Sequence, residues 1–187
     1  MSVFQKNHDW TKDLQLTESP VSYIMRIMFT AFFESFRYTG HLYPFALLRI
    51  FVGYKFFESA LAKVNGDYLL QPRLAAEISE WLPHSSAPLW YKNILTDYVV
   101  ENWQVFSYSI TYSEFLIAIS FILGFFIRPV GLLAVFLTMN YIFNSGPQVA
   151  EIYKIYLVMF LIMMWMGAGR CIGFDYFFFK RQRGLWW

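Results

Sequence analysis

Residues 129–150 read PVGLLAVFLTMNYIFNSGPQVA, a run of 22 residues without Asp, Glu, Lys or Arg. At a rise of about 1.5 Å per residue, a helix of this length crosses roughly 30 Å of hydrocarbon. Two neighbouring stretches share this character: residues 108–127 contain Glu114 as their one charge before Arg128, and residues 155–169 contain none. The sequence therefore predicts membrane-spanning helices over this half of the chain.

The composition supports a membrane protein. Charged residues make up 15% of the chain and hydrophobic residues 57%, whereas a soluble domain averages roughly 25% charged residues. Residues 43–64 are the least clean span, because Arg49, Lys55 and Glu58 interrupt their apolar run. We expect an all-α membrane protein, a four-helix transmembrane bundle. Its predicted spans are residues 43–64, 108–127, 129–150 and 151–170. Gly146 and Pro147, near the end of the third span, favour a turn into the fourth.

The distribution of Lys and Arg predicts the orientation, since cytoplasmic loops carry an excess of both. With a cytoplasmic N-terminus, nine basic residues lie inside: Lys6, Lys12, Arg26, Arg37, Arg128, Arg170, Lys180, Arg181 and Arg183. Four lie outside: Lys63, Arg73, Lys92 and Lys154. We therefore expect an inner (cytoplasmic) membrane protein with both termini in the cytoplasm. The net charge of +2 gives no argument for a nucleic-acid partner.

Three segments flank or connect the spans. Within a cytoplasmic extension of residues 1–41, Val21 to Phe36 mixes aromatic and charged residues, which favours an interfacial helix over a fifth span. The outer loop, Asn65 to Ser107, contains several Trp residues and predicts a folded extracytoplasmic cap at the headgroup level. A four-helix domain of residues 42–178 then precedes a basic and aromatic cytoplasmic tail, residues 179–187.

Several polar residues within the spans are candidates for function, because ionisable groups in a bilayer are costly. Counting along the helices places five of them at similar depths, about 18–24 Å from the inner edge. These are Lys55, Glu58, Glu114, Asn144 and Lys154. Lys55 and Glu58 are three residues apart, so they can pair on one helix face.

This polar layer allows three interpretations. It is a set of structural ion pairs, a pocket for a small substrate or a quinone headgroup, or a contact with a partner subunit. In the pocket interpretation Glu114, Lys55 and Glu58 are the candidate catalytic residues, with Glu114 exchanging protons and Lys55 or Lys154 polarising a carbonyl. The candidate quinone-binding residues are Asn144, Lys154, Asn140 and Arg49.

The first predicted span has a second polar face. At 100° per residue, one narrow stripe contains Arg49, Gly53, Phe56, Ala60 and Lys63. Gly53 and Ala60 allow close helix approach there. At the predicted inner end, Arg49, Arg128 and Arg170 form a ring of arginines, and Asp175 can pair with Arg128 or Arg170. Arginine side chains that extend to lipid phosphate groups explain this ring equally well.

Cofactor-binding patterns are not evident. Cys171 is the single cysteine, and His8, His41 and His84 lie far apart. We therefore expect no metal site and no cofactor bound by this chain alone, apart from a quinone.

The order of several short motifs resembles the DoxX/DoxD family. These are Leu48-Arg49-Ile50-Phe51-Val52-Gly53 with Lys63, then Glu114 with Leu123-Gly124-Phe125-Phe126-Ile127-Arg128, then Gly167-Ala168-Gly169-Arg170 with Gly173-Phe174-Asp175. The structural motif residues of this resemblance are Gly53, Lys63, Gly124, Arg128, Gly167, Gly169 and Asp175. The long outer loop is similar to the DoxD branch, which resembles the small subunit of thiosulfate:quinone oxidoreductase.

The resemblance implies a four-helix membrane fold associated with redox or electron-transport complexes, and it leaves open whether the chain is catalytic. The first hypothesis is a membrane subunit of a redox complex that handles quinone, with a partner carrying the sulfur or flavin chemistry. The second is a non-catalytic subunit that assembles or anchors a larger membrane complex.

Overall fold

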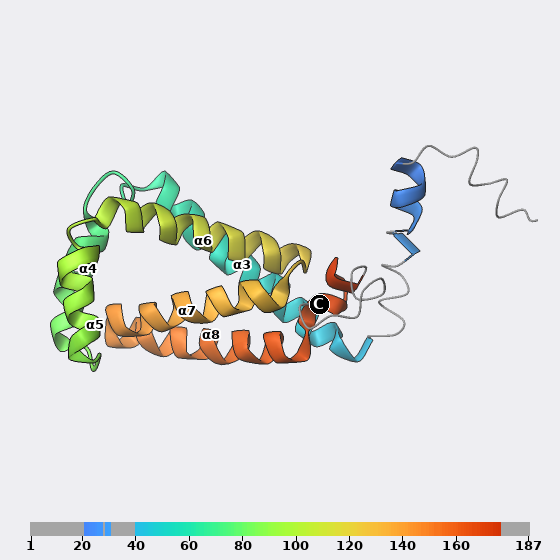
Figure 1. Cartoon of the computed structure of the whole chain (residues 1–187). Helices are drawn as coiled ribbons and strands as arrows, with labels where there is room; N and C mark the ends of the chain where they lie inside the picture. Colours follow the sequence, from blue (N-terminus) through green and yellow to red (C-terminus); the bar gives the residue numbers. More distant parts are fainter. Residues whose placement is uncertain (1–20, 28, 31–39, 177–187) are drawn as a thin grey trace, which may run out of the picture.

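The computed structural model describes residues 21–27, 29–30 and 40–176. Four long helices lie lengthwise, and two short helices lie across one end of them (Figure 1). The long helices are α3 (Tyr43–Asn65), α6 (Trp103–Leu123), α7 (Ile127–Asn144) and α8 (Pro147–Met166). The short helices are α4 (Arg73–Trp81) and α5 (Leu89–Ile94).

Helix pairing leaves one seam less closely packed. α3 packs mainly against α6, α7 packs mainly against α8, and the α6–α7 hairpin joins the two pairs, whereas α3 and α8 touch much less. An aromatic cluster fills the centre: the Phe160 ring lies edge-on to Phe56 and to Phe121, with ring centroids 5.3 and 5.2 Å apart. All three side chains are almost completely buried.

The ends of the helices follow local turn chemistry. Gly124 directly follows α6 and Gly167 directly follows α8, and both glycines adopt the left-handed conformation that favours a residue without a side chain. α7 ends at Asn144, and α8 begins with Pro147 in its first turn. Proline suits the first helical turn because its missing N–H is unpaired there in any case.

These boundaries correct three predicted spans. The predicted breaks after residues 127 and 150 lie at residues 124–126 and 145–146 instead, and α6 begins at Trp103 rather than 108. The prediction relied on the absence of charge, which does not mark a turn between two apolar helices. The sequence Asn144-Ser145-Gly146-Pro147 marks that turn.

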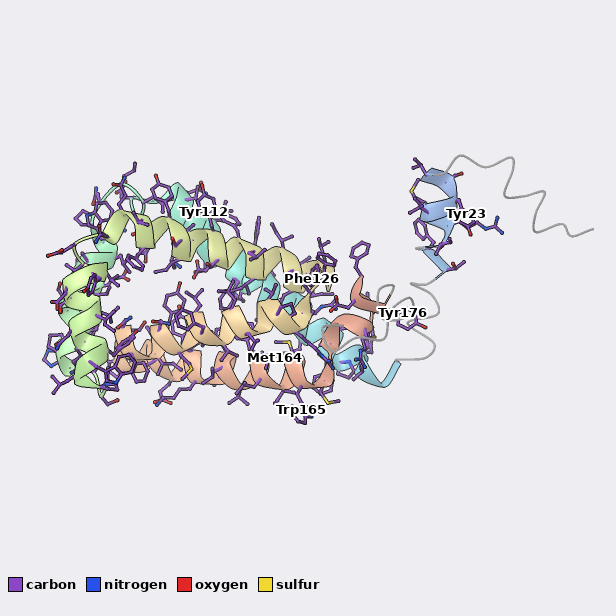
Figure 2. The ribbon with its side chains drawn as sticks, in the orientation of Figure 1. Tyr23, Tyr112, Phe126, Met164, Trp165 and Tyr176 are labelled. Carbon is purple, nitrogen blue, oxygen red and sulfur yellow. The ribbon has the colours of Figure 1, made fainter. Side chains whose placement is uncertain are left out.

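Among the described residues, three helices, α6, α7 and α8, are long and apolar enough to cross a membrane. Their outer faces carry large apolar side chains: Tyr112 of α6 and Trp165 of α8 point away from the bundle (Figure 2) and are 67% and 85% exposed. A soluble protein rarely leaves so much apolar surface in water. The chain is therefore an all-helical membrane protein. α3 is as long as these helices but more highly charged.

The outer loop is folded rather than extended. α4 is followed by a 3-10 turn (Leu82–His84), α5 and a short π-helix (Leu95–Val99). These elements form a cap across the end of the long helices with a separate apolar core. That core consists of Tyr68, Leu74, Ile78, Leu82, Leu95 and Val99.

Part of the expected interfacial helix is described. Residues 21–27 and 29–30 are helical, with exposed Val21, Ile24 and Phe29 side chains. The remainder of that predicted helix to Phe36, the rest of the extension up to residue 39, and the basic tail lie outside the described residues.

Candidate functional site

The centre of the site is a buried ion pair between α3 and α6. The Glu114 side chain is 1% exposed, and the Lys63 ammonium lies 2.6 Å from both of its carboxylate oxygens. The Lys63 side chain is 16% exposed. Placing both carboxylate oxygens at this distance compensates much of the cost of removing the two charges from water.

Two hydroxyl groups complete the contacts of Glu114. The Tyr141 hydroxyl of α7 donates a 2.6 Å hydrogen bond to Glu114 Oε1. The Ser59 hydroxyl lies 3.3 and 3.4 Å from the two carboxylate oxygens, and Lys63 donates to Ser59 Oγ at 3.0 Å. The Lys63 ammonium also lies 5.6 and 5.5 Å from the ring centroids of Tyr68 and Tyr141, within cation–π range. We call Lys63, Glu114, Tyr141 and Ser59 the Glu114 cluster.

The predicted stripe on α3 explains how Lys63 reaches Glu114. Arg49, Gly53, Phe56 and Ala60 are all buried, as predicted for one face of this helix. A Cβ on Gly53 would lie 3.0 Å from the Ile122 backbone nitrogen and 3.1 Å from the Ala118 carbonyl oxygen. The prediction of a close helix contact at Gly53 is therefore confirmed. This contact brings α3 and α6 together, and Lys63 lies further along the same face.

The predicted polar layer does not form one cluster. Lys55 and Glu58 pair with each other at 2.9 Å, as predicted, but on an exposed surface, with side chains 43% and 57% exposed. Lys154 pairs with Glu151 at 2.6 Å on an exposed surface of α8. Position along a helix predicts the depth of a residue in the membrane but not the direction in which its side chain points. Of the three candidate catalytic residues, Lys55, Glu58 and Glu114, only Glu114 therefore lies in the interior.

Asn140 and Asn144 connect α7 to the cap. The Tyr91 hydroxyl of α5 donates to Asn140 Oδ1 at 2.8 Å and accepts from Asn144 Nδ2 at 3.1 Å. Asn140 Nδ2 donates to the Phe136 carbonyl at 2.7 Å, which fixes the orientation of its amide. The two amides thus hold the cap on the long helices.

A cavity of about 440 Å³ lies between the cap and the long helices. Its wall includes members of the Glu114 cluster, Lys63, Tyr141 and Ser59, together with Asn144. The cap contributes Tyr68, Arg73, Glu77 and Trp81 to this wall, and α8 and the turn before it contribute Gly146, Val149 and Tyr153. We call it the cap cavity. Its volume lies within the range of about 300–1,000 Å³ typical of small-molecule sites.

A second cavity of about 240 Å³ lies along the seam between α3 and α8. One side of its wall contains Lys55, Phe56 and Ser59 of α3 and Glu114 of α6, and the other side contains residues of α8. The α8 residues are Val149, Ile152, Tyr153 and Tyr156. We call it the side cavity.

Burial shifts the acidities of cap residues at the cavity. Desolvation raises the pKa of the Tyr68 hydroxyl well above its usual range, and nearby Glu77 and Glu114 add to this shift. Desolvation also raises the pKa of the Glu77 carboxyl, while the charges of Lys63 and Arg73 oppose the change. Tyr68 is therefore a neutral hydrogen-bonding group in the cavity wall.

Arg49 lies at the opposite end of the bundle from the cap. Its guanidinium is completely buried and donates to the carbonyl oxygens of Ala168, Cys171 and Ile172 at 2.9, 3.3 and 2.8 Å. Arg49 thus ties α3 to the segment after α8. This position separates it from the Glu114 cluster, with which it was grouped as a candidate quinone-binding residue.

Asp175 holds the start of α7. Its carboxylate oxygens accept hydrogen bonds from the Phe126 and Ile127 backbone N–H groups at 2.8 and 3.2 Å, and a carboxylate is favourable at the positive end of a helix. Burial raises the pKa of Asp175, whereas these hydrogen bonds and the charges of Arg49 and Arg170 oppose the shift. The sequence predicted an arginine partner for Asp175 and missed its role at the helix end.

The glycines at the end of the bundle opposite the cap leave room for those contacts. A Cβ on Gly124 would collide with Arg49 Nη1, and one on Gly169 would collide with Asp175 Oδ2. Gly167 lies beside the side chains of Arg170 and Arg128. The motif residues at the end of the bundle opposite the cap therefore share a structural role in closing it.

Sequence reasoning missed the partners of Glu114. Lys63 was assigned to a motif and Tyr141 was not singled out, yet both contact the carboxylate. The signal for Lys63 was present, because it shares a face with Arg49 and Gly53. Tyr68, Glu77 and Trp81 reach the cavity through the packing of the cap. The sequence predicts that this segment folds but not which of its residues face the long helices.

Taken together, apolar outer faces and a buried Glu–Lys–Tyr cluster beside a cavity define a helical membrane protein with a polar internal site. Residues 45–145 match the DoxX family over more than half of the 187 residues, and the chain belongs to this family. Family membership suggests a membrane protein of a kind often associated with redox complexes. No curated protein and no solved structure matches the chain.

Proposed function

We propose that this chain is a membrane subunit of a redox complex and that the cap cavity binds a quinone headgroup. The observation that carries the proposal is the Glu114 cluster, which borders a cavity with several aromatic residues in its wall. A quinone presents two carbonyl acceptors on a flat ring. A cation and hydroxyl groups suit the acceptors, and aromatic side chains suit the ring.

The chemistry requires both protons and electrons. Reduction of a quinone to a quinol takes two electrons and two protons, and oxidation releases them. In this proposal Lys63 donates a hydrogen bond to one carbonyl, the role first assigned to Lys55 or Lys154. Glu114 exchanges protons, with the Tyr141 hydroxyl as its neighbour. A partner subunit supplies or accepts the electrons.

We also propose α3 as a fourth membrane span. It is 23 residues long, and the two most interior of its charges are Arg49, which is bonded to carbonyl groups, and Lys63, which is paired with Glu114. The excess of basic residues on one side supports cytoplasmic termini and the inner membrane. A folded cap over the bundle supports the likeness to the DoxD-type subunit of thiosulfate:quinone oxidoreductase.

Tryptophan fluorescence tests quinone binding, because quinones quench nearby indole rings. Trp81 lies in the cap-cavity wall, whereas Trp165 is 85% exposed on the outside of α8. In nanodiscs, a short-chain benzoquinone should quench wild-type fluorescence with a saturable component. Trp81→Phe should remove this component and Trp165→Phe should retain it. Only linear quenching of the wild type, or an unchanged saturable component in Trp81→Phe, would overturn the proposal.

A non-catalytic anchoring role is the second candidate. The supporting observation is that donors from within the chain already surround Glu114. Thermal stability and quinone-dependent turnover of the purified complex distinguish the two roles for Glu114→Gln, since Gln keeps the shape but cannot exchange a proton at neutral pH. Loss of turnover in a complex that remains folded and assembled supports the quinone site. Proportional loss of both, or wild-type values for both, supports anchoring.

A further inference from the structure

The two cavities are neighbours with a common wall. Ser59, Val149 and Tyr153 line both of them. Glu114 lines the side cavity, while its partners Lys63 and Tyr141 line the cap cavity. The Glu114 cluster therefore lies at the junction of the two spaces.

The side cavity extends from this junction toward the middle of the long helices. Along α3 its wall reaches Lys55, eight residues before Lys63, which corresponds to about 12 Å of helix. Along α8 it reaches Tyr156, seven residues beyond Val149, or about 10 Å. The side cavity thus extends away from the cap along both helices.

The wall of the side cavity changes in character along this path. Beyond the junction, Phe56, Ile152 and Tyr156 provide apolar surface. Ile152 is 53% exposed on the outside of the bundle, and Lys55 is 43% exposed. The backbones of α3 and α8 approach each other closely at few positions, although Phe56 packs against Tyr156 and Phe160 across the seam. The side cavity beside these rings leads from the exposed surface toward the Glu114 cluster.

We infer that the site takes an amphiphile with a polar ring and a single long hydrocarbon tail, and that this ligand enters from the bilayer between α3 and α8. The ring occupies the cap cavity and the tail lies in the side cavity. This inference rests on the proposed quinone site and adds the class of quinone: one that is dissolved in the membrane and carries its tail through the α3–α8 seam. A ring without a tail needs only the cap cavity.

Narrowing the side cavity tests this arrangement. Ile152→Phe adds volume in the side cavity alone, because Ile152 lines that cavity and not the cap cavity. Val158→Phe is the matched control, because Val158 is a similarly exposed residue of α8 outside both walls. Quenching of Trp81 in nanodiscs would report the affinity for two probes: a benzoquinone with a decyl tail, and the same ring with methyl substituents only.

The wild type and Val158→Phe should bind both probes. Ile152→Phe should weaken binding of the decyl probe about tenfold or more, because a bulkier side chain competes with the tail for a closely packed space. Binding of the methyl probe should change less than about twofold, which also shows that the variants are folded. Equal effects on both probes, or no effect on either, would overturn the tail route. Failure of the wild type to bind either probe would overturn the quinone site itself.

Discussion

Removing Lys63 should cost more stability than removing the charge of Glu114. The side chain of Glu114 is 1% exposed and that of Lys63 is 16% exposed, so the two groups differ in what remains after their partner is lost. Lys63→Met leaves a fully buried carboxylate with only hydroxyl donors. Breaking a buried pair in this way typically costs about 3–5 kcal/mol.

Glu114→Gln leaves the Lys63 ammonium, which borders the cap cavity and can turn toward it. The glutamine oxygen still accepts hydrogen bonds from Lys63 and Tyr141. Loss of a charge-assisted bond costs about 1.5–3 kcal/mol, so we expect this variant to be the less damaged of the two. The double variant Lys63→Met/Glu114→Gln leaves no buried charge in the Glu114 cluster and should be more stable than Lys63→Met alone.

The assay is the free energy of unfolding in mixed micelles titrated with sodium dodecyl sulfate, for the wild type and the three variants. Lys55→Met is the matched control, because Lys55 is an exposed lysine of the same helix and should change stability little. A Glu114→Gln variant that is less stable than Lys63→Met would refute the reasoning. A double variant no better than Lys63→Met would refute it as well.

Three further predictions concern packing, pH and topology. Gly53→Ala should lower the melting temperature, because the added Cβ meets backbone atoms of α6 at 3.0–3.1 Å. In the control Gly131→Ala the added Cβ lies 3.4 Å from the Met164 side chain, so this change should be neutral or stabilising. Similar effects of the two substitutions would contradict the close contact at Gly53. Because the pKa of Asp175 is raised in the folded state, the folded protein binds a proton at this carboxyl at a higher pH than the unfolded chain does. The melting temperature of the wild type minus that of Asp175→Asn should therefore grow as pH falls from 7 toward 4. A difference that shrinks over this range would mean that the pKa is lowered instead. A cysteine placed at Ser85 in the cap should react with an impermeant external reagent and one placed at Gln182 should not, and the reverse pattern would overturn the proposed orientation.

The sequence was most informative where periodicity and turn chemistry act locally. Arg49, Gly53 and Ala60 share one face of α3, as predicted, because helical geometry alone determines which residues share a face. The structure shows that this face is buried. The Lys55–Glu58 pair likewise follows from spacing along one helix. Gly146 and Pro147 predict the α7–α8 turn where it lies, whereas the absence of charge extends the predicted span past it to residue 150.

The site depends on contacts that no local pattern determines. The partners of Glu114 come from α3 and α7, and their identity depends on how these helices are rotated about their axes. Trp81 and Tyr91 reach the cavity region and α7 because the cap folds back over the long helices. Such placement follows from the packing of the whole cap, which is a tertiary property and not a spacing in the chain.

Photolabelling with an azido-benzoquinone tests the central claim most directly, because it reports where the ring binds. The protein in nanodiscs would be illuminated with the probe, with and without excess unlabelled quinone, and the modified peptides identified by mass spectrometry. The account predicts competable labelling of the cap-cavity wall, at Trp81, Gly146 or Tyr153. Labelling confined to the outer surface of the helices, as at Trp165, and insensitive to the competitor would contradict it.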